Sequence, residues 1–304
     1  MSGNRSDGGS RIGKGGGPQT IQWFPGHMAR TEKEIAKDLK LTDAVVEIID
    51  ARIPVSSRNP VLDRLIGSKP RVVFMNKSDL ADPAQTADWL TLFRAQGYGA
   101  VSADCKTGKN ISRLIPQIES MLSDKIAAWH KKGMVGRKIR VMVVGVPNVG
   151  KSSLINRLAG HSRAAVENRP GVTRANQWFP VGKNAELLDT PGVLWPRFDD
   201  PAVGEHLAFT GAVKDDVVDV ELLARSLLET LRTVAPEALK KRYGLTGEEI
   251  ADFDGAGMLE LVGRKRGMLA GRGAVDTERA AHMLLEEFRS AKIGQITLER
   301  AGEA

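Results

Sequence analysis

Only one cysteine, Cys105, occurs among the 304 residues of the sequence. A single cysteine can form neither an internal disulfide nor a cysteine-rich zinc site, which favours a reducing compartment. The chain also has no apolar run close to the roughly 20 residues that a membrane-spanning helix needs, and no charged and then apolar leader. We therefore expect a cytoplasmic protein with no membrane partner.

Acidic residues are outnumbered, since 44 Lys and Arg oppose 37 Asp and Glu and give a formal net charge of +7. Two basic runs, residues 131–140 and 264–272, contain no acid. Clustered Lys and Arg favour polyanionic partners, because each neutralised phosphate releases counterions. The composition therefore favours a polyanionic partner, with a merely solvated basic surface as the alternative.

Apolar strand patterns and helical patterns alternate from residue 21 to about residue 200, and only helical patterns follow. Such alternation predicts an α/β fold with a mostly parallel sheet and helices on both faces, followed by a smaller all-helical domain. Strands are expected at 43–50, 71–75, 98–103, 139–145 and 185–189, with helices at 31–40, 83–96, 110–131 and 151–160.

Composition divides the chain into four segments. We expect a disordered basic tail rich in Gly and Ser over residues 1–20, because so few large apolar groups cannot offset the entropy of ordering. The α/β domain is expected over residues 21–200, the helical domain over 201–295 and a C-terminal tail over 296–304.

A phosphate-binding loop is predicted at residues 145–152, where GVPNVGKS follows an apolar strand and opens a helix. Its glycines allow a tight turn whose N–H groups face phosphate oxygens, and the helix start adds its positive end. The ammonium of the loop lysine would reach the β- and γ-phosphates and act in catalysis, and the following hydroxyl would bind Mg²⁺. The candidate nucleotide-binding residues here are Asn148, Val149, Gly150, Lys151, Ser152 and Ser153, with Ser152 as the Mg²⁺ ligand.

The tetrapeptide NKSD, residues 76–79, also follows an apolar strand and has the pattern that reads guanine. Asp79 can accept hydrogen bonds from the N1–H and the exocyclic amine of guanine, a donor pair that adenine lacks. Asn76 can contact the base and brace the phosphate loop, and the stem of Lys77 can lie over the ring. After the next strand, Ser102 and Ala103 would bring a backbone N–H near guanine O6.

Two further segments contain residues that could bind a metal ion and contact the γ-phosphate. In DTPG, residues 189–192, Asp189 would hold Mg²⁺ through a water molecule and the N–H of Gly192 would contact the γ-phosphate. Thr173, in RPGVTR, is the candidate second metal ligand, with a plain Pro-Gly turn as the alternative.

These parts occur in an unusual order, because the base reader precedes the phosphate loop. No asparagine occurs from residue 185 to 304, so no second copy of the base-reading pattern follows DTPG. A circular permutation keeps the same sheet in space while it moves the termini, and exposed loops tolerate such a change. We therefore predict a circularly permuted P-loop GTPase domain.

The whole set resembles the circularly permuted GTPases, and specifically the RbgA/YlqF family of ribosome biogenesis GTPases. The resemblance covers about residues 21–295 and rests on QWFPGHM, DARIP, NKSD, GVPNVGKSS, PGVT and DTPGVLWP, together with ERAAHMLLEEFRSAKIGQITLE. It implies GTP hydrolysis during late assembly of the large ribosomal subunit, coupled to ribosome binding, with contacts to ribosomal RNA and ribosomal proteins. The family has mitochondrial members as well.

The resemblance also suggests how hydrolysis proceeds. Val193 occupies the position where many GTPases carry a glutamine that orients water, and a valine side chain cannot hydrogen-bond. The family pattern indicates His27 instead, whose imidazole could orient the water; a packing or RNA-contacting role is the alternative. Asn148 would help to hold K⁺ beside the phosphates, unless it only shapes the loop.

Two other functional classes remain open at this stage. One is a GTPase coupled to membrane or metabolic work, and the other is an RNA-binding protein with a weak nucleotide site. The intact set of Lys151, Ser152, Thr173 and Asp189 disfavours the second class. Because the chain passes from DTPG directly into the helical segments, loss of phosphate could reposition them.

Overall fold

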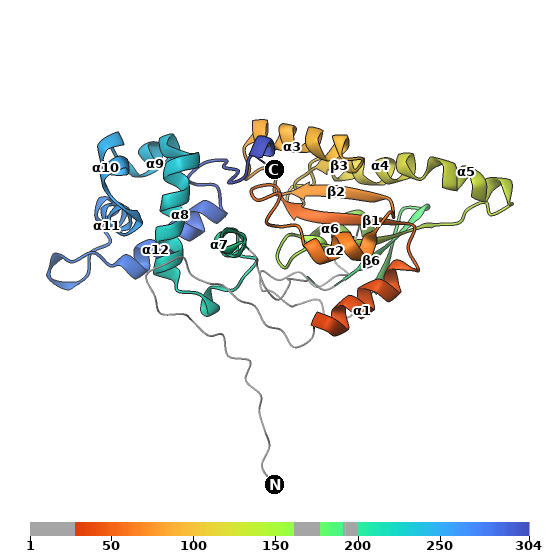
Figure 1. Cartoon of the computed structure of the whole chain (residues 1–304), viewed down its shortest axis with the longest axis horizontal. Coiled ribbons are helices and arrows are strands. Elements are labelled where there is room, and N and C mark those ends of the chain that lie inside the picture. Colours follow the sequence, from red (N-terminus) through yellow and green to blue (C-terminus); the bar gives the residue numbers. More distant parts are fainter. Residues whose placement is uncertain (1–27, 161–176, 191, 193–199, 304) are drawn as a thin grey trace, which may run out of the picture.

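The computed structural model describes residues 28–160, 177–190, 192 and 200–303, and within them six strands form one sheet (Figure 1). The strand order is β3-β2-β1-β4-β6-β5, in which all neighbours are parallel except β5 and β6. The mostly parallel sheet that the sequence predicted is confirmed. The strands are β1 (Ala44–Asp50), β2 (Arg71–Asn76), β3 (Gly99–Ser102), β4 (Ile139–Val144), β5 (Gln177–Val181) and β6 (Ala185–Asp189).

The central strand β1 shows why helices are needed on both faces. All seven of its residues are buried. Because side chains alternate along a strand, Val46 and Ile48 pack in one apolar cluster while Val45 and Ile49 pack in clusters on the other face. The helices of this region are α1 (Met28–Leu39), α2 (Pro60–Ile66), α3 (Pro83–Ala95), α4 (Leu114–Met121), α5 (Ser123–Lys131) and α6 (Lys151–Ala159).

Several helices begin with an Asn or Asp followed by proline. The side chains of Asn59 and Asp82 accept hydrogen bonds from backbone N–H groups at the starts of α2 and α3, at 3.0 and 2.7 Å. Asp200 does the same at the start of α7 (Pro201–Phe209), at 2.8 Å. Each N-cap oxygen satisfies an orphan donor, and the following proline has its φ fixed for the helix and lacks the N–H that would need a partner.

Two local features differ from the sequence prediction. The pattern at 110–131 predicted one helix, but the structure has the two helices α4 and α5, which meet at Leu122 with φ −102° and ψ 10°. β5 was not predicted, because it is an edge strand with an exposed proline, Pro180, within its span. Such positions carry a weak strand signal, although an edge strand tolerates proline.

After residue 200 the described chain is helical, as predicted. The long helix α8 (Val220–Val234) packs against α11 (Gly255–Lys265) and α12 (Thr277–Arg289) through a buried stripe of Leu223, Leu227 and Leu231 at four-residue spacing. The shorter helices α9 (Pro236–Tyr243) and α10 (Gly247–Asp252) complete the region. Among the described residues, no helix combines the length and apolarity that a bilayer crossing requires.

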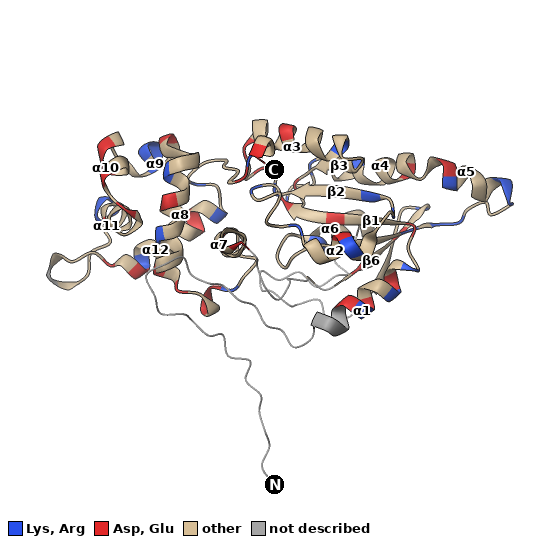
Figure 2. Cartoon of the chain, in the orientation of Figure 1, with Lys and Arg blue, Asp and Glu red and all other residues tan. Residues whose placement is uncertain are grey.

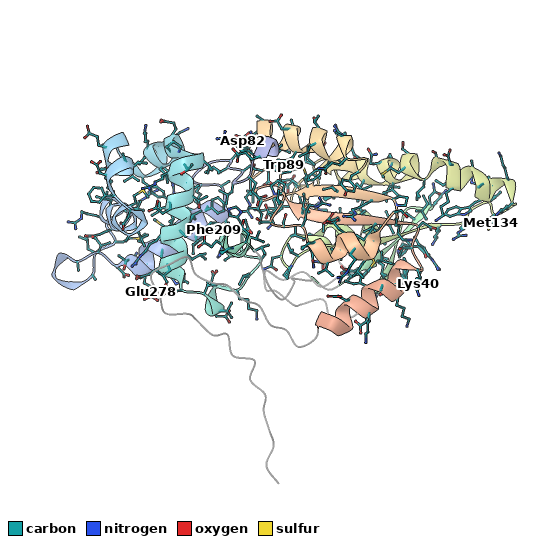
Figure 3. All side chains as sticks on the ribbon, viewed as in Figure 1. Lys40, Asp82, Trp89, Met134, Phe209 and Glu278 are labelled. Atoms are coloured by element: carbon teal, nitrogen blue, oxygen red, sulfur yellow. The ribbon has the colours of Figure 1, made fainter. Side chains whose placement is uncertain are left out.

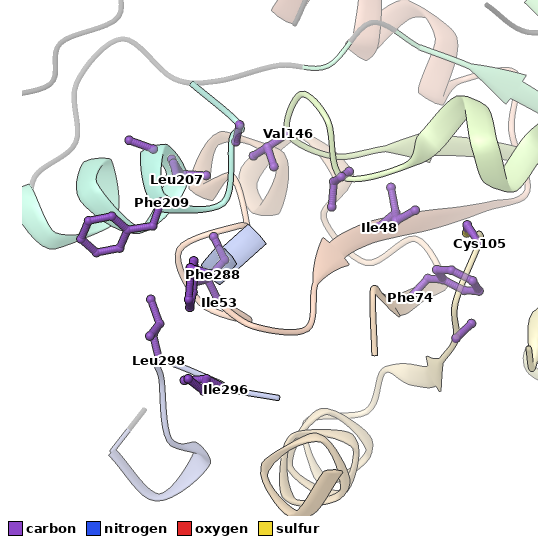
Figure 4. Packing of buried hydrophobic residues seen from close by; sticks show 14 of the residues in the cluster. Ile48, Ile53, Phe74, Cys105, Val146, Leu207, Phe209, Phe288, Ile296 and Leu298 are labelled. Atoms are coloured by element: carbon purple, nitrogen blue, oxygen red, sulfur yellow. The ribbon is translucent and has the colours of Figure 1, made fainter. Parts of the chain in front are cut away.

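The C-terminal residues return from the helical region to the sheet. Asp82 and Trp89, labelled in Figure 3, meet this segment: the N–H of Asp82 donates to Thr297 Oγ1 at 3.1 Å and Trp89 Nε1 donates to the Glu299 carbonyl at 3.0 Å. Ile296 and Leu298 share a buried cluster with residues of both regions (Figure 4). Most of the segment that the sequence analysis assigned to a C-terminal tail is therefore bonded to the α/β region.

Candidate nucleotide site

The three predicted motifs lie at one edge of the sheet. NKSD follows β2, the phosphate loop follows β4 and DTPG follows β6, and β1 lies between β2 and β4. Carboxyl ends of parallel strands meet at the same edge, where ligands of open α/β sheets bind. Segments about 70 residues apart in the sequence are thus brought together there, since Asn76 Nδ2 donates to the Val149 carbonyl at 2.7 Å.

The phosphate loop joins β4 to α6 through backbone conformations that few residues adopt. Gly150 has φ +106°, and a Cβ there would lie 2.3 Å from Asn76 Nδ2, so a larger residue would break the contact between the two motifs. Asn148 has φ 56°, a left-handed conformation that asparagine tolerates. The loop ends at the N-terminus of α6, where free N–H groups and the helix dipole favour phosphate.

Lys151 is buried inside this loop. Its Nζ donates to the carbonyls of Val146 at 2.7 Å and Gly145 at 3.1 Å. Burial lowers the pKa of Lys151 to about 8, and the Asp189 carboxylate opposes part of that effect. A phosphate group would supply the negative charge that the ammonium needs in this position.

Ser152 and Asp189 fit a magnesium ion. Ser152 Oγ donates to Asp189 Oδ2 at 3.3 Å, so a hydroxyl and a carboxylate are adjacent. Within the described residues, the buried Asp189 Oδ1 has no hydrogen-bond partner, an unfavourable state that a cation or its water would relieve. Burial raises the pKa of Asp189, opposed by Lys151 and Ser152. Hard oxygen donors of this kind are those that Mg²⁺ prefers.

Gly192 places DTPG directly against the phosphate loop. A Cβ at Gly192 would lie 2.8 Å from Pro147 Cα and 2.9 Å from Lys151 Nζ, so this close approach requires glycine. Thr190 Oγ1 donates to the Val143 carbonyl at 2.7 Å and fixes the start of the turn to β4. The predicted proximity of Gly192 to the phosphate-binding residues thus has a geometric basis.

The base-reading loop is held from two sides. Asn76 Oδ1 accepts from the N–H of Cys105 at 2.9 Å while its Nδ2 bonds the phosphate loop, so one amide joins three segments. Lys77 has φ 59°, and its Nζ lies 3.0 Å from Asp50 Oδ2. Burial lowers the pKa of Lys77, and the Asp50 carboxylate offsets part of that shift.

Asp79 is exposed, and its pKa is raised by partial burial and by the neighbouring Asp104 carboxylate. A carboxylate in this situation gains from a ligand that offers two N–H donors. Ser102 ends β3, and the N–H of Ala103 donates to the Met75 carbonyl at 2.9 Å. That N–H is engaged within the sheet and is not available to guanine O6 in this arrangement.

Asp50 and Arg52 form a buried pair whose role the motifs did not predict. Arg52 Nη2 and Nε donate to the two Asp50 oxygens at 2.7 and 2.9 Å, and both side chains are buried. Burial raises the pKa of Asp50, but the charges of Arg52 and Lys77 outweigh it and hold that pKa far below its usual range. Charged residues at the end of a mostly apolar strand and directly after it were the signal that could have identified this pair.

Two predicted residues, His27 and Thr173, lie outside the described residues, as do Val193 and the segment RPGVTR. Asn148 is described, and its Nδ2 donates to the Gly211 carbonyl at 2.8 Å, a contact to the turn after α7 that the sequence did not indicate.

Comparison with known proteins places the chain among GTPases. The family model described as 50S ribosome-binding GTPase matches residues 140–226, which include the phosphate loop and DTPG but not the base reader. Ribosome biogenesis GTPase A of Priestia megaterium is 46% identical over 286 residues, which cover 94% of this chain and 98% of that protein. Mitochondrial ribosome-associated GTPase 1 of Mus musculus is 36% identical and covers 93% of this chain and 91% of its own length.

Among solved structures, GNP-bound YlqF from T. maritima has a TM-score of 0.62 and 26% identity, with 90% of this chain and 98% of that chain covered. The GDP-bound form of the same protein has the same TM-score and identity. The predicted resemblance and the GTPase fold are confirmed by these matches, since the similarity extends over nearly the full length of both chains. The chain belongs to the ribosome biogenesis GTPase A family of GTPases.

Proposed function

We propose that this GTPase acts in late maturation of the large ribosomal subunit and that its turnover is coupled to ribosome binding. The observation that carries the nucleotide part is the amide of Asn76, which bonds the phosphate loop at Val149 and the second base-side loop at Cys105. One side chain thereby fixes the spacing between the part of the site that would hold the phosphates and the part that would read guanine. The ribosomal part rests on the names of the relatives.

The proposed binding roles follow from the geometry. Asp79 accepts from the guanine N1–H and exocyclic amine, and the stem of Lys77 lies along the ring while Asp50 holds its ammonium. Lys151 and the N–H groups at the start of α6 neutralise the phosphates. The remaining contacts that we propose come from Asn76, Ser102, Asn148, Val149, Gly150, Ser152, Ser153, Thr173 and Gly192. The predicted contact of the Ala103 N–H is not kept, because that N–H donates to the Met75 carbonyl.

Ser152, Thr173 and Asp189 would hold Mg²⁺, which GTPases in general use. When bound, the ion would supply positive charge that neutralises the phosphates. The contribution of the chain is to hold the Ser152 hydroxyl and the Asp189 carboxylate side by side and to keep Lys151 buried against the same loop. An exchange of Asp189 for asparagine should therefore weaken the dependence of nucleotide affinity on Mg²⁺.

His27 is our proposed catalytic residue, since Val193 cannot orient water. Its imidazole would align the attacking water or accept a proton from it near neutral pH. His27→Ala should lower ribosome-stimulated turnover at saturating GTP while GDP affinity is kept. Full stimulated turnover in this variant would exclude the role.

We further propose that Asn148 supports a K⁺ ion beside the phosphates. Its Nδ2 donates to the Gly211 carbonyl, which fixes the rotation of the amide and hence the direction of its oxygen. A cation there would add positive charge where negative charge develops during hydrolysis. Equal turnover in Na⁺ and K⁺ buffers would rule out this ion.

The proposed partners are a precursor of the large subunit, ribosomal RNA and ribosomal proteins, met in the cytoplasm. Lys131 and Lys132 are exposed at the C-terminal end of α5, one of the places where the ribbon in Figure 2 is blue for Lys and Arg. The second basic run suits RNA less well, because Arg264 pairs with Glu260 at 2.9 Å and Lys265 pairs with Glu249 at 2.6 Å. We therefore favour the end of α5 as the RNA contact.

A sucrose-gradient experiment with a non-hydrolysable GTP analogue tests this function. The protein should sediment with the large subunit or its precursor when the analogue is bound and should be released with GDP. Lys131→Glu together with Lys132→Glu should weaken the association, whereas Lys240→Glu, at a half-buried residue of α9 that pairs with Glu237, should not. Sedimentation with the small subunit or with neither particle would contradict the proposal.

A further inference from the structure

The C-terminal end of α7 is a junction between the helical region and the nucleotide site. Arg289, the last residue of α12, donates from Nη2 to the Ala208 carbonyl at 2.8 Å and from Nε to the Phe209 carbonyl at 3.0 Å. The same guanidinium bonds both carboxylate oxygens of Asp215 at 2.7 Å. A cation that binds the final carbonyls of a helix stabilises that helix end, and a bidentate carboxylate fixes the orientation of the guanidinium.

A first connection runs from this junction to the phosphate loop. The chain turns after α7 at Gly211, which has φ +80° and whose N–H donates to the Ala208 carbonyl at 3.1 Å. The carbonyl of Gly211 then accepts from Asn148 Nδ2 at 2.8 Å. A shift of the end of α7 would therefore be transmitted to the phosphate loop through one hydrogen bond.

A second connection runs from Arg289 to the base reader. Arg52 Nη1 donates to the carbonyl of Arg289 at 3.4 Å, and its other nitrogens hold Asp50. Asp50 in turn lies 3.0 Å from the ammonium of Lys77. The position of the α12 end therefore bears on the lysine that we expect over the guanine ring.

Both connections border the same space. A cavity of about 730 Å³ is lined by Lys77 and Asn148 from the two nucleotide loops and by Gly211, Asp215 and Arg289 from the helical region. Leu207 and Phe209 of α7 and Phe288 of α12 belong to the apolar cluster that also contains Val146 and Ile48 beside the phosphate loop (Figure 4). The helical region is thus a wall of the space next to the proposed nucleotide site.

We propose that Arg289 is a positioning residue for the guanine nucleotide. It ties the end of α12 to the end of α7 and to Arg52, and so it keeps Asn148 and Lys77 in the orientation that the nucleotide requires. Nucleotide binding should therefore stabilise the same junction. By linkage, a partner that binds the helical region would change the nucleotide affinity by the same factor by which the nucleotide changes the affinity for that partner. This inference rests on the proposed nucleotide site.

The test compares two arginines of the helical region that form the same kind of pair. Arg289 binds Asp215 with side chains that are 24% and 37% exposed, whereas Arg242 on α9 binds Glu287 of α12 with 31% and 9%. Arg289→Met and Arg242→Met each remove a bidentate arginine and keep an apolar stem. GDP affinity and dissociation rate, GTPase KM and kcat, and thermal stability are measured for both variants and for Arg289→Lys.

We expect Arg289→Met to weaken GDP binding by about five- to tenfold, mostly through faster dissociation, within the range of known coupling effects. KM for GTP should rise more than kcat falls, because Lys77 and Asn148 act in binding. Arg289→Lys should restore part of the affinity, since an ammonium can still bond the α7 carbonyls. Arg242→Met should stay within twofold of the wild type in GDP affinity even where it lowers the melting temperature.

Hydrogen exchange gives a second readout, first on the unmodified protein and then on both methionine variants. GDP should slow exchange at residues 208–212 and at the end of α12, and this protection should be lost in Arg289→Met but kept in Arg242→Met. No protection at the junction, or equal affinity losses in the two methionine variants, would overturn the inference while the proposed site stands. Failure of the wild-type protein to bind guanine nucleotides would instead refute the site itself.

Discussion

The α/β region and the helical region differ in where they bury charge. Within the part of the α/β region that the structure describes, eight charged side chains are buried: Asp43, Glu47, Asp50, Arg52, Arg71, Asp104, Lys151 and Asp189. Of these, Asp50, Arg52, Lys151 and Asp189 lie at or beside the carboxyl ends of β1, β4 and β6. Among the described residues from 200 to 303, Glu287 is the one buried charged side chain, within a core of Leu, Ala, Met and Phe. Burial of charge is unfavourable without partners, so its concentration at one sheet edge marks the site of chemistry.

This contrast predicts different responses to substitution. A substitution of a buried charged residue at the carboxyl ends of the strands should alter nucleotide affinity. It should also lower the free energy of unfolding where it breaks a buried ion pair. A change in the apolar stripes of α8 or α12 should alter stability and leave the nucleotide site intact as long as the protein is folded. Arg289 is the exception that we propose, a residue of the helical region whose effect is on binding.

The largest effect is expected from Asp79→Asn. Guanine would lose the carboxylate that accepts its N1–H and amine, whereas xanthine offers a carbonyl in place of the amine and suits an amide. GTP affinity should fall by about 10³-fold or more and XTP affinity should rise, because a site built for a donor pair discriminates strongly. Competition of GTP and of XTP against a fluorescent GDP measures the two affinities. Unchanged GTP affinity would exclude Asp79 as the residue that reads the base.

Arg52→Met should give the next largest effect. It would leave the fully buried Asp50 with Lys77 as its remaining charged partner, and breaking such a pair costs about 3 kcal/mol or more. Urea unfolding should show this loss, and GDP should bind more weakly because Lys77 is no longer held in place. Arg52→Lys keeps the charge and should lose less; a loss below about 1 kcal/mol in the methionine variant would show that the pair is not structural.

Leu227→Ala tests the other side of the contrast. Leu227 is fully buried on α8, so its truncation should lower the free energy of unfolding by about 3 kcal/mol. GDP affinity, measured at a temperature where the variant is folded, should remain within twofold of the wild type. A tenfold loss of affinity would mean that the helical core, and not only Arg289, determines the nucleotide site.

The smallest predicted effect is a pH dependence that arises from Asp79. Its pKa is raised above the ordinary 3.8 by partial burial and by Asp104. In the proposed site guanine binds the ionised form, so binding should lower that pKa. The contribution to affinity is complete above the pKa of the free protein and is lost as the pH falls through it, by at most about tenfold per pH unit. Asp104→Asn should move this loss to lower pH; an unchanged midpoint would remove Asp104 as a cause.

The sequence predicted the parts of the fold that have local signatures. Alternating apolar strands, the glycine spacing of the phosphate loop and the order of NKSD before GVPNVGKS were sufficient for the sheet and the permuted GTPase domain. The edge strand β5 and the break at Leu122 were missed, because an edge strand with an exposed Pro180 and a one-residue interruption between two helices leave little periodic signal.

Contacts between distant segments could not be predicted in this way. Arg289 and Arg52 are 237 positions apart, and Trp89 and Glu299 are 210 apart, so no spacing rule connects them. A basic residue at a helix end is common, and its partners here are backbone carbonyls that the sequence does not distinguish. The motifs therefore predicted candidate nucleotide contacts and the contact of Asn76 with the phosphate loop, but they did not indicate Arg52 or Arg289.

Hydrogen exchange across the whole chain, with GDP and with ADP, tests the central claim most directly. The claim is that two segments far apart in the sequence, residues 76–80 and 145–152, enclose one guanine nucleotide. We expect GDP to slow exchange in both segments with the same midpoint concentration and ADP to slow neither at the same concentrations. Protection confined to the phosphate loop, or equal protection by ADP, would contradict the account.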